Sequence, residues 1–252
     1  MLWGIGNKEH LDIDYRRHVE YLQSTKRVLQ RRLKERFGAP RAAALWVRAQ
    51  HIYEGFVREM PYTGGRRNLQ AHALYDSIMC FAYWEAMPED QREPVEEFEE
   101  TVALVFNGDI SKARRKPEWL TANNEPLLRA IAPIGKLVFC LQNRVVRSGM
   151  WNNAWECRMS SDERAPLHVE LIGCPIADFA RSHGYQHLMP AMCNPDHHSM
   201  TDFGMYLVRP SVVGRGDALC DYYIMGDRTP TALASPAMPD EQGFLVNQLP
   251  EA

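Results

Sequence analysis

The spacing of apolar residues changes between the two halves of the chain, and this change limits the fold more than any other sequence feature. From Tyr15 to Phe37 and from Leu45 to Phe56, apolar residues recur every three or four positions, as in amphipathic helices. Between residues 136 and 226, several stretches alternate with a period of two, as in strands. We predict an α+β fold, with a helical N-terminal half packed on an antiparallel sheet that carries an inserted helix.

The helical half is predicted to extend from residue 10 to residue 106. Gly38 and Pro40 end its first helix, and Pro61 ends the second. The third segment is apolar on several faces, which indicates a central buried helix, and the fourth is acidic with an apolar stripe. The predicted helices are residues 15–37, 45–56, 69–87 and 94–106.

The second half is predicted to form the sheet. Its expected strands are residues 137–141, 151–159, 167–173, 204–209 and 218–224. Pro175 opens an inserted helix at 176–183, which Gly184 ends. We divide the chain into a helical region (1–135), a cysteine-containing α+β region (136–228) and an extended tail (229–252), all within one compact unit.

Composition excludes several classes of protein. A net charge of −3 provides no positive field for a nucleic acid, and no apolar run is long enough to cross a membrane. The residues after Met1 do not have the pattern of a signal peptide, so we expect a cytoplasmic protein. Its six cysteines form no C-x-x-C pair and are expected to be free thiols. We expect a small-molecule substrate as partner, and a homo-oligomer remains open.

Cys174 lies where a predicted strand ends and a helix begins. The positive end of a helix lowers the pKa of a thiol and makes it more nucleophilic, so Cys174 is a candidate catalytic residue. The alternative is that Cys174 packs as a small apolar side chain at this junction.

A short segment after the inserted helix holds the densest set of reactive side chains. Cys193, Asp196 and His197 supply a thiol, a carboxylate and an imidazole, the groups needed for nucleophilic or acid–base catalysis. Alternatively, the Asn-Pro-Asp sequence is only a turn, and Asp196 caps the next stretch of chain.

Cys220 and Asp221 are neighbours on a predicted strand, so their side chains point to opposite faces and only one of them faces a given pocket. If Asp221 is buried, Arg209 on the preceding strand is a candidate partner.

A metal site is a further alternative. Cys174, Cys193 and Cys220 with His168 or His198 would supply four ligands, but the short-spaced pairs of zinc ribbons and fingers are absent. We expect no cofactor, and leave a divalent metal open. The sequence has no P-loop, G-x-G-x-x-G, G-x-S-x-G or H-E-x-x-H motif.

Several motifs resemble one family. They are Pro61-Tyr62-Thr63-Gly64-Gly65-x-x-Asn68, Cys174-Pro175, Cys193-x-x-Asp196, the strand ending in Arg209, and Gly216-x-x-x-Cys220-Asp221-Tyr222. This succession, over roughly residues 55–225, resembles the L-2-amino-thiazoline-4-carboxylic acid hydrolase family. The second half also resembles vinyl-reductase-type small-molecule-binding domains.

The resemblance implies hydrolysis of a carbon–nitrogen bond in a small cyclic amidine, with opening of a thiazoline-type ring by water. Two routes remain: attack by Cys193 or Cys174, or activation of water by Asp196 or a histidine such as His197. Asp196 or Asp221 is a candidate to hold the cationic nitrogens, and Arg209 a substrate carboxylate. The expected substrate-binding residues are Gly64, Gly65, Asn68, Arg209, Cys220 and Asp221.

Two alternative functions stay open. Where the family pattern has Arg-Thr and Cys-Asp-Phe-Arg, this chain has Arg209-Pro210 and Cys220-Asp221-Tyr222-Tyr223. One alternative is therefore an enzyme of secondary metabolism that forms or rearranges a ring, and the other is a non-enzymatic small-ligand-binding module. For each, we expect one pocket between the two halves, lined by Cys174, Cys193 and Asp196.

Overall fold

A computed structural model describes residues 21–60, 71–108, 121–149, 155–160, 162, 164–199 and 203–250. The predicted start of the first helix, and the candidate residues Gly64, Gly65 and Asn68, lie outside these described residues.

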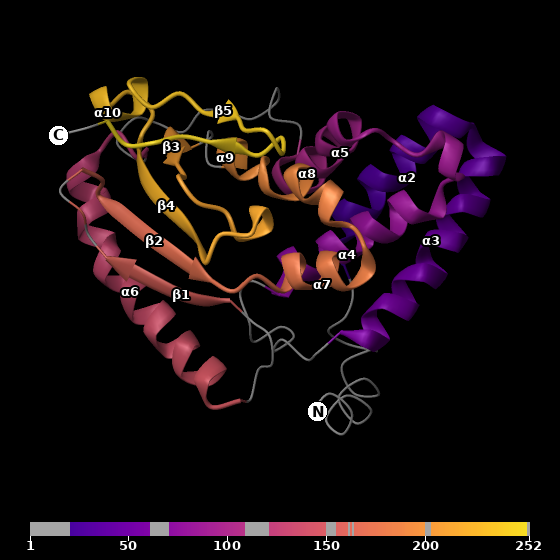
Figure 1. Ribbon diagram of the computed structural model, residues 1–252, viewed down its shortest axis with the longest axis horizontal. Helices are drawn as coiled ribbons and strands as arrows, with labels where there is room; N and C mark the ends of the chain where they lie inside the picture. Colours follow the sequence, from indigo (N-terminus) through magenta and orange to yellow (C-terminus); the bar gives the residue numbers. More distant parts are fainter. Residues whose placement is uncertain are drawn as a thin grey trace.

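The N-terminal half is helical, as the apolar period predicted (Figure 1). Gly38, with φ of 74°, ends the first described helix, and Pro40 lies in the first turn of the next one, where a missing N–H costs nothing. Pro40 therefore starts a helix and does not stop one. The elements are α2 (Gln23–Phe37), α3 (Ala39–Glu59), α4 (Ala71–Ala86), the short 3-10 helix η2 (Glu89–Gln91) and α5 (Val95–Asn107).

Helix α4 is the centre of this half, which confirms the prediction of a buried helix. Thirteen of its 16 residues are buried, including Phe81 and Tyr83 with no exposed surface. Such an all-round apolar helix is stable only when other elements surround it. Helices α3 and α5 and the inserted helix α7 (Pro175–His183) all contact it. Gly184 ends α7 in a left-handed conformation, as predicted.

A four-stranded antiparallel sheet forms the second half, so the α+β class is confirmed. Its order is β1-β2-β4-β3, with β1 at Glu156–Ser160, β2 at Leu167–Ile172, β3 at Met205–Val208 and β4 at Leu219–Gly226. Between β2 and β3 the chain forms α7, η5 (Gln186–Leu188), α8 (Met189–Cys193) and α9 (Asp196–Ser199), and η7 (Val213–Arg215) precedes β4.

The prediction of a strand at residues 137–141 is wrong. These residues belong to helix α6 (Glu125–Arg147), which packs along β1 at the lower left of Figure 1. All five are apolar, and a short apolar run fits a strand as well as a helix. Five consecutive residues are too few to show a helical period, whereas over the whole of α6 the apolar residues recur every three or four positions. Cys140 consequently lies on an exposed helix surface and not on a strand.

The segment predicted as an extended tail contains regular structure. Helix α10 (Pro230–Leu233) is followed by a two-stranded ribbon, β5 (Met238–Pro239) with β6 (Leu245–Val246). Phe244 is 2% exposed, and the Asn247 side chain accepts a hydrogen bond from the backbone N–H of Arg209 at 2.7 Å. The segment therefore packs on the sheet region.

All six cysteines are free thiols, as predicted. Within the described ranges, none of the helices combines the length and the apolar character needed to cross a membrane.

Substitution of Asn143 on α6 tests how the edge strand β1 is attached to the helix. Its amide group donates to the Cys157 carbonyl at 2.5 Å and accepts from the Cys157 N–H at 2.9 Å, so it pairs backbone groups of β1 that point away from the sheet. Asn143→Ala leaves these buried groups unpaired and should lower the free energy of unfolding by about 1–3 kcal/mol in urea titrations. Lys136→Ala, at an exposed position of the same helix, is the control and should change it by less than about 0.5 kcal/mol. Equal effects of the two changes would contradict this role.

Candidate functional site

A cavity of about 290 Å³ lies between the two halves of the molecule. From the helical half, α4 contributes Ala73 and Ser77, and α5 contributes Phe106 and Asn107. The rest of the lining comes from the second half, chiefly from α8, α9, β4 and the start of α7. Its volume suits a small molecule, close to the lower limit of ligand pockets in proteins.

Sulfur and aromatic side chains dominate the wall contributed by the second half. Three of the six cysteines meet here, together with two methionines and two aromatic residues, which makes a polarizable apolar surface. The residues are Cys174, Cys193, Cys220, Met189, Met192, Trp155 and Tyr222.

Each thiol is placed by local backbone geometry. Cys174 is the N-cap of α7, and its Sγ accepts from the Ala177 N–H at 3.5 Å. Cys220 Sγ accepts from the Val213 N–H at 3.2 Å. Cys193, at the end of α8, lies against Gly214, where an added Cβ would be 3.0 Å from its sulfur. Gly214 thus allows the loop before β4 to approach the thiol.

The expected lowering of the Cys174 pKa is wrong. Burial raises the pKa of Cys174 to about 12, although the Ala177 N–H and the Trp155 side chain oppose the rise. Burial also raises the pKa of Cys193 and that of Cys220, against the opposing effect of Arg209. The loss of hydration on burial raises the thiol pKa values more than the positive end of the helix lowers that of Cys174. All three cysteines are therefore neutral thiols at pH 7.

Asp196 is the acidic group of the cavity. Its Oδ2 accepts from the Tyr222 hydroxyl at 2.8 Å and from Arg209 at 3.1 Å, whereas Oδ1 has no partner in the described part of the chain. The side chain keeps 42% of its surface exposed, and it lines the cavity. Its apolar surroundings raise the pKa of this carboxyl, while Arg209 and the Tyr222 hydroxyl act in the opposite direction.

Arg209 lies behind Asp196 and has no exposed surface. Its guanidinium donates to the Cys193 carbonyl at 2.8 Å and to the Leu245 carbonyl at 3.1 Å, besides its contact with Asp196. Among the described residues its Nε has no partner. Because the guanidinium is buried outside the cavity lining, it orients Asp196, and the expectation that it contacts a substrate carboxylate does not fit this geometry. The suggested pairing of Arg209 with Asp221 is wrong.

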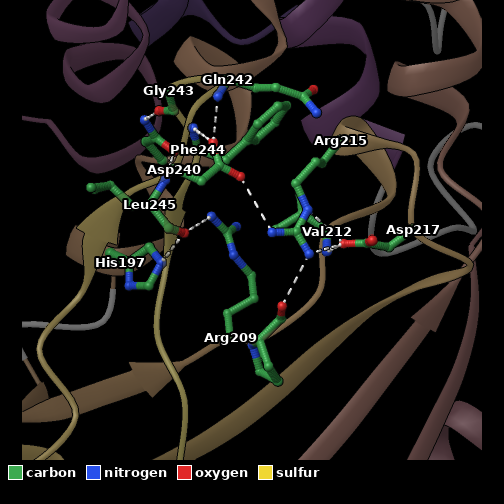
Figure 2. Close-up of polar contacts among 12 residues, drawn as sticks. His197, Arg209, Val212, Arg215, Asp217, Asp240, Gln242, Gly243, Phe244 and Leu245 are labelled. Atoms are coloured by element: carbon green, nitrogen blue, oxygen red, sulfur yellow. Dashed lines mark hydrogen bonds and ion pairs between the residues drawn. The ribbon is translucent and has the colours of Figure 1, made fainter.

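A second arginine fixes the loop before β4. Arg215 contacts Asp217 at 2.5 Å and Asp240 at 3.3 Å, and it donates to the Pro210 carbonyl at 3.2 Å (Figure 2). These contacts join the η7 turn, which carries Gly214, to the C-terminal segment. The position of Cys193 against Gly214 depends on this loop.

His197 is turned toward the C-terminal segment. Its Nε2 donates to the Leu245 carbonyl at 3.0 Å, the same oxygen that accepts from Arg209 (Figure 2). Burial and the nearby Arg209 lower the pKa of His197 to about 4, so the ring is neutral at pH 7. His197 is not among the residues that line the cavity.

Asp221 lies on the other face of the sheet, so of the pair it is Cys220 that faces the cavity. The Asp221 carboxylate contacts His168 Nε2 at 2.6 Å, and the Ser160 hydroxyl contacts His168 Nδ1 at 2.9 Å. In the cross-strand register Ser160 lies directly opposite His168. Asp221 lies diagonally from His168, two positions from its direct partner Tyr223, and therefore on the same face of the sheet.

The alternative metal site is not assembled. Throughout the described ranges, no three His, Cys, Asp or Glu side chains form a group able to hold a metal ion. His168 is engaged on the opposite face of the sheet from Cys220, which separates it from the thiols.

Sequence reasoning missed the contributions of Tyr222 and Asn107. The strand period could have identified Tyr222, because it follows Cys220 by two residues and shares its face. Asn107 ends α5 and donates to the Pro195 carbonyl at 3.1 Å, next to Asp196. No local pattern indicates that contact, which joins residues far apart in the sequence.

Comparison with known protein families supports the resemblance. A family model described as L-2-amino-thiazoline-4-carboxylic acid hydrolase matches residues 72–224, which include all of α4 except its first residue, all of α5 and every cavity residue named above. No curated protein and no solved structure matches the chain.

The raised thiol pKa values predict an order of alkylation. A thiol with a raised pKa has less thiolate at any given pH, so Cys174 and Cys193 should react slowly with iodoacetamide at pH 7.5 and faster as the pH rises. Cys140, which is exposed, should be labelled first. Peptide mapping by mass spectrometry measures each rate, and labelling in denaturant provides the reference. Fast labelling of Cys193 or Cys174 at pH 7 would contradict the assignment of neutral thiols.

Proposed function

The chain belongs to the L-2-amino-thiazoline-4-carboxylic acid hydrolase family, and on this premise we propose that it opens the ring of a small cyclic amidine by hydrolysis. The supporting observation is the Asp196 carboxylate, which is held through Oδ2 in a cavity lined by sulfur and aromatic groups, while Oδ1 has no partner among the described residues. A carboxylate in such a place can bind and move protons for a bound heterocycle.

The cavity suits the proposed class of substrate in size and surface. A volume of about 290 Å³ accommodates a single five-membered ring with its substituents. Soft sulfur and aromatic side chains favour contact with a polarizable, sulfur-containing ring. Asp196 supplies a negative group for an amidine, which carries N–H donors and binds a proton readily.

In the proposed reaction, water attacks the carbon between the ring sulfur and the ring nitrogen. Asp196 Oδ1 accepts a proton from this water as its oxygen bonds to the carbon. As the oxygen adds, the π electron pair of the carbon–nitrogen double bond moves to the ring nitrogen, and the proton on Asp196 passes to that nitrogen. Asp196 Oδ1 then takes the proton of the new hydroxyl group as the carbonyl forms. The remaining carbon–nitrogen bond breaks with its electron pair on nitrogen, and this second proton passes to the nitrogen to complete the amine. The sum is one substrate plus one water, giving an open-chain thiocarbamate with a free amine.

The contacts of Asp196 suit a general base. An apolar environment raises its pKa and makes it more basic than an exposed carboxylate. The Arg209 guanidinium and the Tyr222 hydroxyl oppose that rise and favour the ionised form that the reaction needs. These contacts also fix the direction in which Oδ1 points.

The neutral thiols favour attack by water over attack by cysteine. A cysteine nucleophile reacts as thiolate, and burial raises the pKa of both Cys193 and Cys174. In the proposed site these residues shape the wall and exclude bulk water. A cysteine route would instead leave a covalent adduct on Cys193 or Cys174, which intact-protein mass spectrometry of the reacting enzyme detects.

Replacement of Asp196 tests the proposal directly. The protein is incubated with L-2-amino-thiazoline-4-carboxylic acid and related cyclic amidines, and products are identified by mass spectrometry as substrate plus one water. Asp196→Asn should lower turnover at least about a hundredfold, the usual scale for losing a general base. Asp221→Asn is the matched control, since it makes the same change on the opposite face of the sheet and should keep near-normal turnover.

Other outcomes distinguish the alternatives. Binding without any product would favour a ligand-binding module, and ring closure from an open-chain precursor would favour a ring-forming enzyme. Full activity in a folded Asp196→Asn protein would overturn the proposed mechanism.

Tyr222→Phe tests the role of the hydroxyl in the pH dependence. The Tyr222 hydroxyl stabilises ionised Asp196, so its removal raises the carboxyl pKa further. Since the base must be ionised, activity is lost as pH falls through this pKa, and the acidic limb of the kcat/KM profile should move to higher pH in the variant. An unchanged or lowered limb would show that another group controls it.

A further inference from the structure

Helix α6 carries a stripe of large apolar residues on its outer surface. The stripe consists of Leu127, Ile131, Ile134, Leu137, Val138 and Leu141, whose exposed fractions lie between 37% and 64%. Figure 1 shows α6 at the margin of the molecule, along β1 and β2. Six such residues on one helix are more than the scattered apolar residues normal for a protein surface.

The side of α6 that packs on the sheet is a different one. Leu128 is 3% exposed, a Cβ at Gly135 would lie 2.9 Å from the Met159 sulfur, and Asn143 holds the backbone of Cys157. The exposed stripe is therefore not needed to attach α6 to its own sheet. The helix thus has a second apolar side, which faces away from the sheet.

The spacing of the stripe is that of a helix that pairs with another helix. Residues 127, 131, 134, 138 and 141 are separated by four, three, four and three positions, and Val145 continues the series while partly buried. This alternation brings one narrow line of side chains to the same side of the helix and defines the seam of a coiled coil. It selects a helix as the partner.

The charges of α6 disfavour a lipid surface as the partner. At 3.6 residues per turn, Arg129, Lys136 and Arg147 lie nearly opposite the stripe, and Arg144 alone lies near its border. A helix bound to an anionic membrane needs basic residues beside its apolar face, where they reach the headgroups. On α6 the cations Arg129, Lys136 and Arg147 lie on the side opposite the stripe. When two stripes meet, these cations of the two copies are therefore too far apart to repel one another.

We propose that the stripe on α6 is the contact through which a second copy of this chain forms a two-fold dimer. When two α6 helices lie antiparallel about a point near residue 136, Leu127 faces Val145, Ile131 faces Leu141, and Ile134 faces Val138. Each of these contacts is apolar on both sides, which is the self-complementarity that a two-fold interface requires. The exposed apolar area, on the order of 500 Å², supplies most of the roughly 800 Å² that each partner buries in a standard interface.

The mass of the full chain in solution tests this proposal. Light scattering coupled to size exclusion, from 1 to 50 µM protein, should give twice the 29.0 kDa chain mass. The double substitution Ile134→Glu and Leu141→Glu places acids in the seam and should convert the protein to a monomer, with at least a tenfold loss of affinity. Circular dichroism and thermal unfolding verify that the variant stays folded.

Two controls make the result specific. Leu233→Glu makes the same kind of change at a 74% exposed position on α10 and should leave the dimer intact. Lys136→Glu, on the far side of α6, should do the same. A wild-type monomer at 50 µM would overturn the proposal, as would a dimer that persists in the double variant. Sedimentation of monomer with anionic vesicles, lost in the double variant, would overturn it in favour of a lipid surface.

Discussion

A guanidinium group without any exposed surface must find all its compensation within the protein, and Arg209 imposes this requirement on the site. Its partners come from three places: the end of α8 through Cys193, the start of α9 through Asp196, and β6 through Leu245. A buried cation with too few acceptors would cost several kcal/mol. The charge of Arg209 therefore brings these segments together and sets the position of the Asp196 carboxylate at the cavity.

The sequence was informative where one physical signal acted alone. The all-round apolar character of α4 predicted its burial, and Pro175 and Gly184 marked the ends of α7. It was misleading where two effects competed. The short apolar run at residues 137–141 fits a strand as well as the longer helix to which it belongs, and Cys174 has a raised pKa because desolvation exceeds the effect of the helix end.

Long-range pairing was the other part that local patterns could not supply. Strand neighbours made Asp221 a reasonable partner for Arg209, but the ladder between β3 and β4 ends at Val208, and Arg209 turns toward α9. Asp221 instead contacts His168, which lies diagonally from it across β2 and β4 on the same face of the sheet. Cys193 and Asp196 both line the cavity because α8 ends at the first and α9 begins at the second, with a turn between them. The Asn-Pro-Asp sequence had indicated this turn.

The C-terminal ribbon has a consequence for how such a site can be inherited. The family model matches the chain up to residue 224, yet the Leu245 carbonyl accepts from Arg209 and His197, and the Leu245 N–H donates to Asn194 at 2.8 Å. The segment that matches the family model is therefore shorter than the segment whose hydrogen bonds hold the site. A recombination event that preserved residues 72–224 and exchanged the remainder would transfer the cavity lining with only two of the three acceptors of its most buried charge, so a change in the ribbon alters the hydrogen bonding behind the site.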